Sequence, residues 1–381
     1  MSYLITAIGA ILILAVLFDT FEVIILPRQV TRRIRFTRIF YRTTWIPWAA
    51  VAERLGRRRE ASLGAYGPFS LLLLLSLWAF GLILGFALIH YGSGSRLNTT
   101  ESINFLTDLY LSATTFFTLG LGDVTPATVH SRIFVALEAG LGFGFLGMVI
   151  SYLPVLYGAF AQREVSISLL DARAGSPPTA YELLKRYGDH DGTRPGGHGD
   201  DLEQFLREWE RWSAELLESH LSYPVLAYYR SQHSNQSWLS ALSCILDSCS
   251  VILVGLKSGP VRQARLTFAM ARHAVIDLCQ VFDTPPRLGE CESRLLPEQQ
   301  DAIVKALQKG GLGQKRKADW DKELKELRSL YEPYIAALSA HFRLKLPPWA
   351  HEKSIHDNWQ STPWKEITGR ELPRIKDTDH F

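Results

Sequence analysis

Residues 118–123 read Thr-Leu-Gly-Leu-Gly-Asp, a pattern able to surround a cation with backbone oxygens. Carbonyl oxygens that replace the water shell of a cation must point to one axis, so the side chains must point away from it. Glycine alone readily adopts the backbone angles that this requires, and Gly120 and Gly122 supply it at alternate positions. The expected cation ligands are backbone or hydroxyl oxygens of Thr118, Leu119, Gly120 and Leu121.

An apolar segment with the length of a short helix precedes this motif. Residues 102–117 are too short to cross a bilayer core, which needs about 20 residues in a helix. Thr100, Glu101 and Ser102 predict the N-terminus of that helix. Irregular backbone at membrane depth is tolerated only where it is buried or lines a watery path. The sequence therefore predicts a re-entrant pore helix followed by a carbonyl-lined filter that ends at Asp123.

Three longer apolar segments enclose the re-entrant one and predict membrane-spanning helices. Residues 3–26, 69–91 and 133–161 are each long and apolar enough to cross a bilayer. Ten arginines lie between the first two segments, and an excess of positive charge marks a cytoplasmic loop. We therefore expect a multi-pass protein of the plasma membrane, with its N-terminus outside and its C-terminal half in the cytoplasm.

The loop between the first two spans combines arginine with apolar and aromatic residues. Its arginines partly follow a helical rhythm, which would suit a voltage sensor, but no separate apolar span carries them. The mixture predicts a helix in the headgroup layer, with its arginines on anionic lipid. The ten residues are Arg28, Arg32, Arg33, Arg35, Arg38, Arg42, Arg54, Arg57, Arg58 and Arg59.

Three acidic residues fall within predicted spans. Asp19 and Glu22 lie three residues apart, hence on one helix face near the arginines, and two interpretations remain. They form ion pairs with those arginines, or they take part in conduction. Glu138, near the start of the third span, receives no role from the sequence.

The filter motif and its surroundings resemble the pore of potassium channels, whose filter reads T-V-G-Y-G-D. Pro126, Thr128 and Arg132 match the P-x-T-x-x-G-R stretch that opens the inner helix of many such channels, with Ser131 in place of glycine. The resemblance covers roughly residues 69–162. It includes the two-pore-domain potassium channels, in which Gly-Leu-Gly and Gly-Phe-Gly filters occur.

That resemblance implies K⁺ in the filter, no other cofactor, and an inner helix that carries the gate. A filter of this type needs four loops, and the chain has one, so we expect a homotetramer. The resemblance also shows a departure, because Leu121 replaces the tyrosine whose hydroxyl braces the filter in many members. The aromatic pair of the pore helix is reduced to Tyr110 and Leu111.

The third span contains the residues expected to line and gate the pore. Gly142 falls at the spacing of the family's hinge glycine, and Pro154 removes a helical hydrogen bond. The alternatives are that Pro154 ends the span and that the glycines of residues 140–147 form a packing face. The expected pore-lining and gating residues are Gly142, Phe143, Leu146, Ile150 and Pro154.

The second half of the chain reads as helical. No run of alternating residues predicts a sheet, and no glycine-rich turn follows a strand, so a nucleotide-binding domain is not expected. The fold class is therefore an all-α membrane protein with an α-helical cytoplasmic domain. Helices are predicted at residues 201–221, 236–256, 261–282, 297–308 and 317–344. The predicted regions are the first span (1–27), the arginine-rich segment (28–67), the pore module (68–162), the helical domain (163–345) and a loosely ordered tail (346–381).

No catalytic constellation stands out in that half, and we do not expect an enzyme. His190 and His198 lie among aspartates in a glycine-rich stretch, which indicates a metal site or, more simply, a solvated linker. The four cysteines form no CxxC pair and read as small core residues. A net charge of +3 gives no reason to expect a nucleic-acid partner.

Three functions compete at this stage. The first is a passive channel that conducts K⁺, or in a weaker form one that selects poorly among cations. The second is a channel-derived membrane sensor or scaffold with little conduction, and the third is a membrane-tethered enzyme, which the missing catalytic motif disfavours. The helical domain has two interpretations: it biases the gate, or it only holds four chains together.

Overall fold

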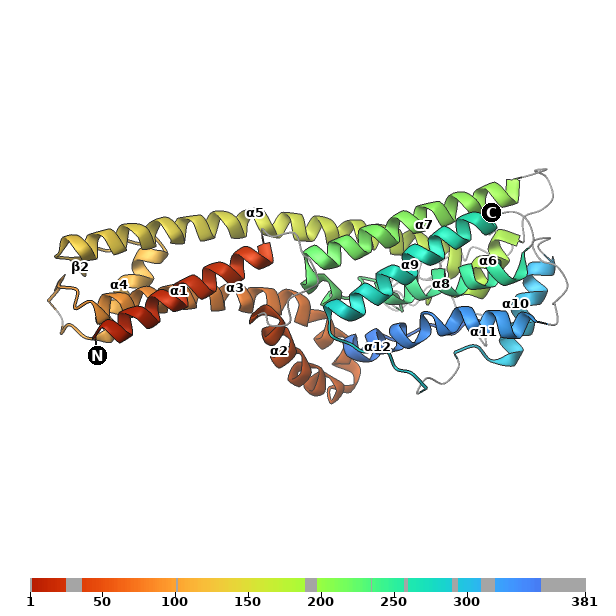
Figure 1. The fold of residues 1–381 in the computed structure, drawn as a ribbon, viewed down its shortest axis with the longest axis horizontal. Coiled ribbons are helices and arrows are strands. Elements are labelled where there is room, and N and C mark those ends of the chain that lie inside the picture. The colour runs from red at the N-terminus through yellow and green to blue at the C-terminus, as the bar shows by residue number, and fades with distance from the viewer. Residues whose placement is uncertain are drawn as a thin grey trace, which may run out of the picture. The chain divides into compact units, whose positions relative to one another are not determined.

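The computed structural model shows a chain that is almost entirely helical over its described residues (Figure 1). It divides into two compact units, Met1–Gly158 and Ala159–Phe381. The only strands among the described residues, β1 (Leu97–Asn98) and β2 (Thr125–Pro126), form a short antiparallel pair. The predicted all-α fold is confirmed. The described residues are 2–24, 36–100, 102–188, 197–233, 235–256, 260–289, 294–309 and 319–350.

The first unit is built on two helices that approach each other closely. A Cβ atom on Gly9 would lie 2.5 Å from the carbonyl oxygen of Gly85, and one on Gly85 would lie 2.5 Å from Ile13. These glycines let α1 and α3 pack backbone to backbone as an antiparallel pair, and Figure 1 shows the two helices side by side. The elements of this unit are α1 (Ser2–Ile24), α2 (Phe36–Glu53), the 3-10 turn η1 (Gly56–Arg58), α3 (Arg59–Gly92), α4 (Phe105–Phe116) and the first part of α5 (Val129–Ala174).

An apolar core joins α3 to its neighbours. Phe86 of α3 and Phe116 of α4 are buried in it, and α5 adds Phe134 and Phe145 at its edge. The core therefore fixes α4, the predicted pore helix, between two longer helices.

Two helices are longer than the spans that the sequence predicted. Helix α3 begins at Arg59 and continues through Pro68, where we had expected the span to start. Helix α5 continues through Pro154 to Ala174, so the interpretation that Pro154 ends the span is wrong. A proline removes one hydrogen bond, and a helix packed on its neighbours can tolerate that loss.

Helix α2 occupies part of the arginine-rich segment. Its buried side packs on α3 through Tyr41 and Trp45, while Ile39 and Ile46 are exposed on its other side. Apolar side chains on the open face suit a helix in the headgroup layer. Arg28, Arg32, Arg33 and Arg35 lie outside the described residues.

Among the described residues, four helices are long and apolar enough to cross a membrane, one more than predicted. Three are Tyr3–Ile24, Gly56–Gly92 and Val129–Ala174, and the fourth is Trp238–Gly255. The fourth helix, α8, is 89% buried within the second unit. A helix surrounded by protein on all sides reaches the same hydropathy as a span, so its composition does not decide between the two.

The second unit surrounds α8 with other helices. Four of its five predicted helices are present, and the fifth is divided between α11 and α12. Pro333 explains the division, because it sits in the first turn of α12 and lacks the N–H that a continuous helix would need. The elements are α6 (Ala180–Gly188), which we had not predicted, α7 (Gly197–Ser222), the 3-10 turn η2 (Pro224–Tyr228), α8 (Trp238–Gly255), α9 (Val261–Val281), α10 (Pro297–Lys309), α11 (Trp320–Ser329) and α12 (Glu332–Phe342).

The start of the predicted loose tail is packed rather than loose. The Trp349 side chain is fully buried, and its carbonyl accepts a hydrogen bond from the Tyr181 amide at 3.1 Å. Gln299 donates to the carbonyl of Ala350 at 3.1 Å. The packed part of the chain thus extends at least to residue 350, and residues 351–381 lie outside the described residues.

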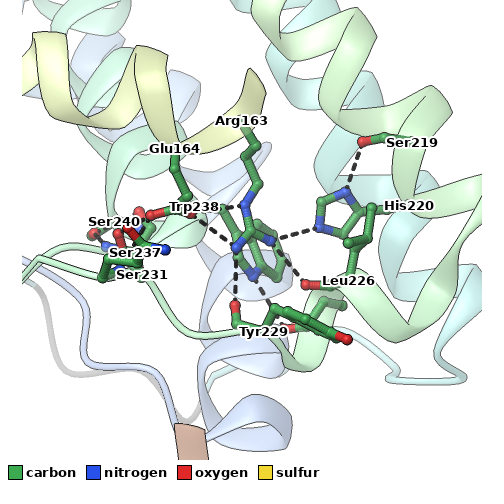
Figure 2. Close-up of polar contacts among 12 residues, drawn as sticks. Arg163, Glu164, Ser219, His220, Leu226, Tyr229, Ser231, Ser237, Trp238 and Ser240 are labelled. Carbon is green, nitrogen blue, oxygen red and sulfur yellow. Dashed lines mark hydrogen bonds and ion pairs between the residues drawn. The ribbon is translucent and has the colours of Figure 1, made fainter. Parts of the chain in front are cut away.

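A buried arginine holds the last turns of α5 within the second unit (Figure 2). Arg163 donates to the carbonyl oxygens of Leu226 and Tyr229 at 2.8 and 3.0 Å, and to the Glu164 carboxylate at 3.0 Å. The same guanidinium lies 3.4 Å from Nε2 of His220. A buried charge is tolerated only with such partners, because an unpaired one would lose its hydration without compensation.

His220 is neutral in this arrangement. Its Nδ1 donates to the carbonyl of Leu216 at 2.8 Å, which leaves Nε2 as the acceptor that faces Arg163. Burial lowers the pKa of His220 to about 3, and the charge of Arg163 acts in the same direction.

We predict that His220 makes the folded protein sensitive to acid. The unfolded chain binds the proton more readily, so this contribution is complete above the ordinary histidine pKa of 6.5 and falls as the pH drops toward 3. About one and a half pH units below 6.5, the loss is about 2 kcal/mol. His220→Gln should flatten the acid decline of the thermal midpoint in detergent. His273→Gln, at an exposed histidine, is the matched control, and an equal decline in all three proteins would contradict the prediction.

Candidate functional site

Helix α4 has both of its ends satisfied by the chain itself. At its start, the Asn104 side chain accepts hydrogen bonds from the amides of Leu106 and Thr107 at 2.9 and 3.1 Å. The Thr107 hydroxyl in turn accepts from the Asn104 amide at 3.4 Å, which completes a capping box. The helix therefore begins after Asn104 rather than at the predicted positions 100–102. The Asn-x-x-Thr spacing is the signal that could have located this cap.

The end of α4 leads directly into the glycine motif. The amide of Thr118 donates to the carbonyl of Thr115 at 2.9 Å, and that of Leu119 to the carbonyl of Thr114 at 2.8 Å. With Thr118 at a φ of +56°, this is the Schellman pattern that ends many helices. Glycine usually occupies the left-handed position, so a threonine there is strained by about 1–3 kcal/mol.

Left-handed backbone recurs at alternate residues of the motif. Gly120 has a φ of +55° and Gly122 a φ of +83°, whereas Leu119 and Leu121 between them are not left-handed. An ordinary strand turns successive carbonyls to opposite sides, and a left-handed residue at every second position reverses that alternation. The two leucine side chains are about 60% exposed within the single chain. The arrangement permits successive carbonyls to face one side, as cation coordination would require.

Tyr110 connects α4 to the far end of the motif. Its hydroxyl donates to the Asp123 carboxylate at 2.7 Å, across the whole length of the filter segment. We had expected the filter to lack such a brace, because Leu121 has no hydroxyl. The structure instead shows a hydroxyl from α4 bonded to Asp123, a contact that the sequence distance between the two residues did not reveal.

The predicted pore-lining residues separate onto two faces of α5. Phe143, Leu146 and Ile150 are exposed by 73, 54 and 62%, and Pro154 is also exposed. Gly142 is buried instead, and a Cβ atom there would lie 2.1 Å from the carbonyl oxygen of Phe116. Gly142 therefore does not share the exposed face, and it serves the close approach of α5 to the end of α4. A Cβ on Gly140, Gly144 or Gly147 would have no atom within 4 Å in this chain.

The first residues of α5 bond to the segment that follows the filter. The Thr128 hydroxyl accepts from the Ser131 amide at 3.3 Å and lies 2.7 Å from its hydroxyl. Arg132 donates to the carbonyl of Pro126 at 3.4 Å. Ser131, which replaces a glycine of the family pattern, thus takes part in the cap of this helix.

Other residues that the sequence singled out have structural partners. Asp19 accepts hydrogen bonds from Thr37 at 3.1 Å and from Trp78 at 2.8 Å rather than from an arginine among the described residues. His273 and Asp277 form an ion pair on the surface of α9 at 3.4 Å.

The described residues offer no cluster of three or more side chains able to hold a metal. His190 lies outside them, and His198 has no described side chain. Cys244, Cys249 and Cys279 are free and buried, as predicted for core residues, whereas Cys291 lies outside the described residues.

Comparison with known proteins finds similarity in the central part of the chain. Residues 72–156, which contain α4, the glycine motif and most of the membrane part of α5, match a family model described as an ion channel. The protein named uncharacterized membrane protein YdjJ from Bacillus subtilis (strain 168) is 24% identical over 203 residues. That match covers 51% of this chain and 55% of YdjJ, so the chain spans about half the length of this relative. No solved structure matches the chain.

The match and the fold together define an all-α membrane protein with an ion-channel domain. The predicted resemblance to a potassium-channel-type pore is confirmed at the level of the family.

We predict that Gly142→Ala displaces the end of α4. The added methyl group would overlap the Phe116 carbonyl, and overpacking of this kind costs about 1–3 kcal/mol. The thermal midpoint of the purified protein in detergent should fall. Gly140→Ala is the matched control, since its Cβ has free space and alanine favours the helix. An unchanged midpoint for Gly142→Ala would show that the contact is not tight.

We predict that Tyr110 and Asp123 stabilise each other by about 1 kcal/mol, the range of a partly exposed hydrogen bond to a carboxylate. A double-mutant cycle of Tyr110→Phe and Asp123→Ala, measured by denaturation in detergent, should return a coupling energy of this size. Tyr91→Phe controls for the loss of a hydroxyl on an exposed tyrosine. A coupling energy near zero would show that the hydrogen bond between Tyr110 and Asp123 does not stabilise the protein.

Proposed function

We propose that the protein is a passive, K⁺-preferring channel in which four copies place residues 118–123 around one axis. The observation that carries the proposal is the left-handed backbone at Thr118, Gly120 and Gly122, directly after a helix too short to span. At 12 residues, α4 is about 18 Å long against a hydrocarbon core of about 30 Å. These residues lie within the segment that matches the ion-channel family model.

Under this proposal the filter binds K⁺ through oxygens of Thr118, Leu119, Gly120 and Leu121. Asp123 is held by Tyr110, which supports the filter against deformation in place of the missing tyrosine at position 121. A homotetramer follows from the single filter segment in the chain.

The exposed face of α5 is the proposed inner pore. Phe143, Leu146 and Ile150 have no partner large enough to bury them within one chain, and in a tetramer this face would surround the axis. Pro154, on the same face and without a backbone N–H, is the proposed point of bending. Gly142 supports the gate from the opposite face, by its contact with α4.

We propose that the protein lies in the plasma membrane with its N-terminus outside and the domain of residues 163–345 in the cytoplasm. The support is the excess of arginine between the first two spans. Helix α2 also supports this placement, because its exposed Arg42 lies beside the exposed apolar residues Ile39 and Ile46. This combination suits anionic headgroups above acyl chains.

The helical domain is proposed to bias the inner helix rather than only to assemble four chains. The supporting observation is that residues 162–174, which follow the predicted inner helix, belong to α5 itself. Arg163 then fixes that part of α5 within the second unit. A helix transmits a displacement with less loss than a flexible linker would.

The test is flux in liposomes that contain the purified protein. We predict a K⁺ flux that exceeds the Na⁺ flux, and its loss in Gly120→Ala, because alanine disfavours left-handed backbone by about 1–2 kcal/mol. Gly56→Ala is the matched control: Gly56 has a φ of +53° and free space around it, but lies in η1.

Each other outcome contradicts a stated part of the proposal. Equal K⁺ and Na⁺ fluxes would indicate a poorly selective cation channel. No flux from an intact tetramer would indicate a sensor or scaffold derived from a channel. Full flux in Gly120→Ala would remove the filter assignment.

A further inference from the structure

Three helices of the first unit bring together polar side chains that the proposed conduction pathway does not use. His90 comes from α3, Ser112 from α4 and Glu138 from α5, and none has any exposed surface. Nε2 of His90 lies 3.9 Å from Oε2 of Glu138. The Ser112 side chain lies beside the same carboxyl group. Burial is complete within a single chain, so it does not depend on assembly.

This cluster lacks the hydrogen bonds that buried polar groups normally have. Neither carboxyl oxygen of Glu138 has a hydrogen bond of normal geometry, and the same holds for Nε2 of His90 and Oγ of Ser112, although they lie close by. Asp108, one turn before Ser112 on the same face of α4, has a carboxyl oxygen in the same condition. Unpartnered buried groups are rare, and each destabilises the folded protein. Retention of several at one junction therefore calls for a functional explanation.

The number of protons that His90 and Glu138 hold between them gives that explanation. Nδ1 of His90 faces the Ser95 hydroxyl at 3.3 Å, so Nε2 is the nitrogen that faces Glu138. With one proton between them, the two side chains carry no net charge, either as imidazole with carboxylic acid or as imidazolium with carboxylate. A second proton leaves one buried positive charge, and removal of the last proton leaves one buried negative charge. Both charged states are disfavoured away from water.

We propose that His90 and Glu138 share one proton behind the pore helix and that gain or loss of this proton alters conduction. The pair positions α4, so these are positioning residues for the filter, and this inference rests on the proposed channel function. The ligand of the site is a proton, since the described residues form no metal-binding cluster.

The pair is close to the contacts that hold the filter. Glu138 lies one turn before Gly142, whose backbone meets the Phe116 carbonyl at the end of α4. His90 packs edge-on against Phe134, also on α5, with ring centroids 6.0 Å apart. If a charge forces Glu138 or His90 to move, α5 must therefore shift against the end of α4. The shift would occur at Phe116, two residues before Thr118.

The ionisable groups around the pair are few. Asp108 faces the junction from α4, and its carboxylate adds to the negative charge that deprotonation would create. The acidic residues of α1, Asp19 and Glu22, lie toward the far end of α3 from His90, where Asp19 is bonded to Thr37 and Trp78. The pH response is consequently assigned to His90 and Glu138, with Asp108 as a modulator.

The test is K⁺ flux in liposomes with the same pH on both sides, varied from acid to alkaline. In the wild type, flux should fall at both extremes. Glu138→Gln cannot lose a proton and should lose the alkaline decline, whereas His90→Gln cannot gain one and should lose the acid decline. Glu60→Gln, at an exposed carboxylate of α3, should keep both.

A second measurement does not need conduction. Infrared difference spectra between neutral and alkaline pH should contain a carboxyl band in the wild type that is absent in Glu138→Gln. A wild type without flux but with this band would defeat the proposed function and leave the proton pair intact. Flux whose pH profile is the same in all four proteins, or no such band, would overturn the inference.

Discussion

The backbone amides and carbonyls between α4 and α5 need hydrogen-bond partners at membrane depth, where no helix supplies them. The rest of the first unit is arranged around that requirement. Lipid offers no hydrogen bonds, so each free amide or carbonyl there must find a partner in the protein or face a watery path. The capping box at Asn104 satisfies the start of α4, and the bonds from Thr118 and Leu119 satisfy its end. The carbonyls of residues 118–123 remain, and in the proposed channel they would face the ion path, where unpaired carbonyls are useful.

Glycine serves two different purposes around this segment. Gly120 and Gly122 adopt left-handed backbone, which a side chain would disfavour. Gly9, Gly85 and Gly142 have ordinary helical backbone, and they are small because another helix passes where the Cβ would be. The first purpose can be recognised from a local pattern, but the second depends on residues far away in the sequence.

That distinction explains how much the sequence could predict. Apolar length predicted the apolar helices and the short helix, and the alternating glycines predicted the left-handed backbone at Gly120 and Gly122, because each of these signals is local. The contact of Gly142 with Phe116, the bond from Tyr110 to Asp123 and the pair of His90 with Glu138 join different elements, and no local pattern contains them. The burial of Trp349 was missed for the same reason.

In the second unit, the hydropathy of α8 is that of a membrane span, whereas its contacts are those of a buried helix. Its composition would allow it to span a membrane, yet Asp247 in its middle bonds to Arg294 at 2.8 Å and to the Tyr331 hydroxyl at 2.7 Å. Arg294 and Tyr331 lie in the segments just before α10 and α12, and helices of the same unit cover α8. A buried ion pair with an added hydroxyl is tolerated in a protein interior, and it specifies one register for the helices it joins.

The length of α3 has a consequence for how the membrane meets the protein. Its 34 residues measure about 51 Å, and to fit them in a core of about 30 Å would need a tilt of about 54°, beyond the usual range of about 0–40°. Residues 69–91, free of fixed charge, fill the core, so residues 59–68 form a rigid extension about 15 Å long outside it. Pro68 falls at the boundary, where water can satisfy the carbonyl that its missing N–H leaves free.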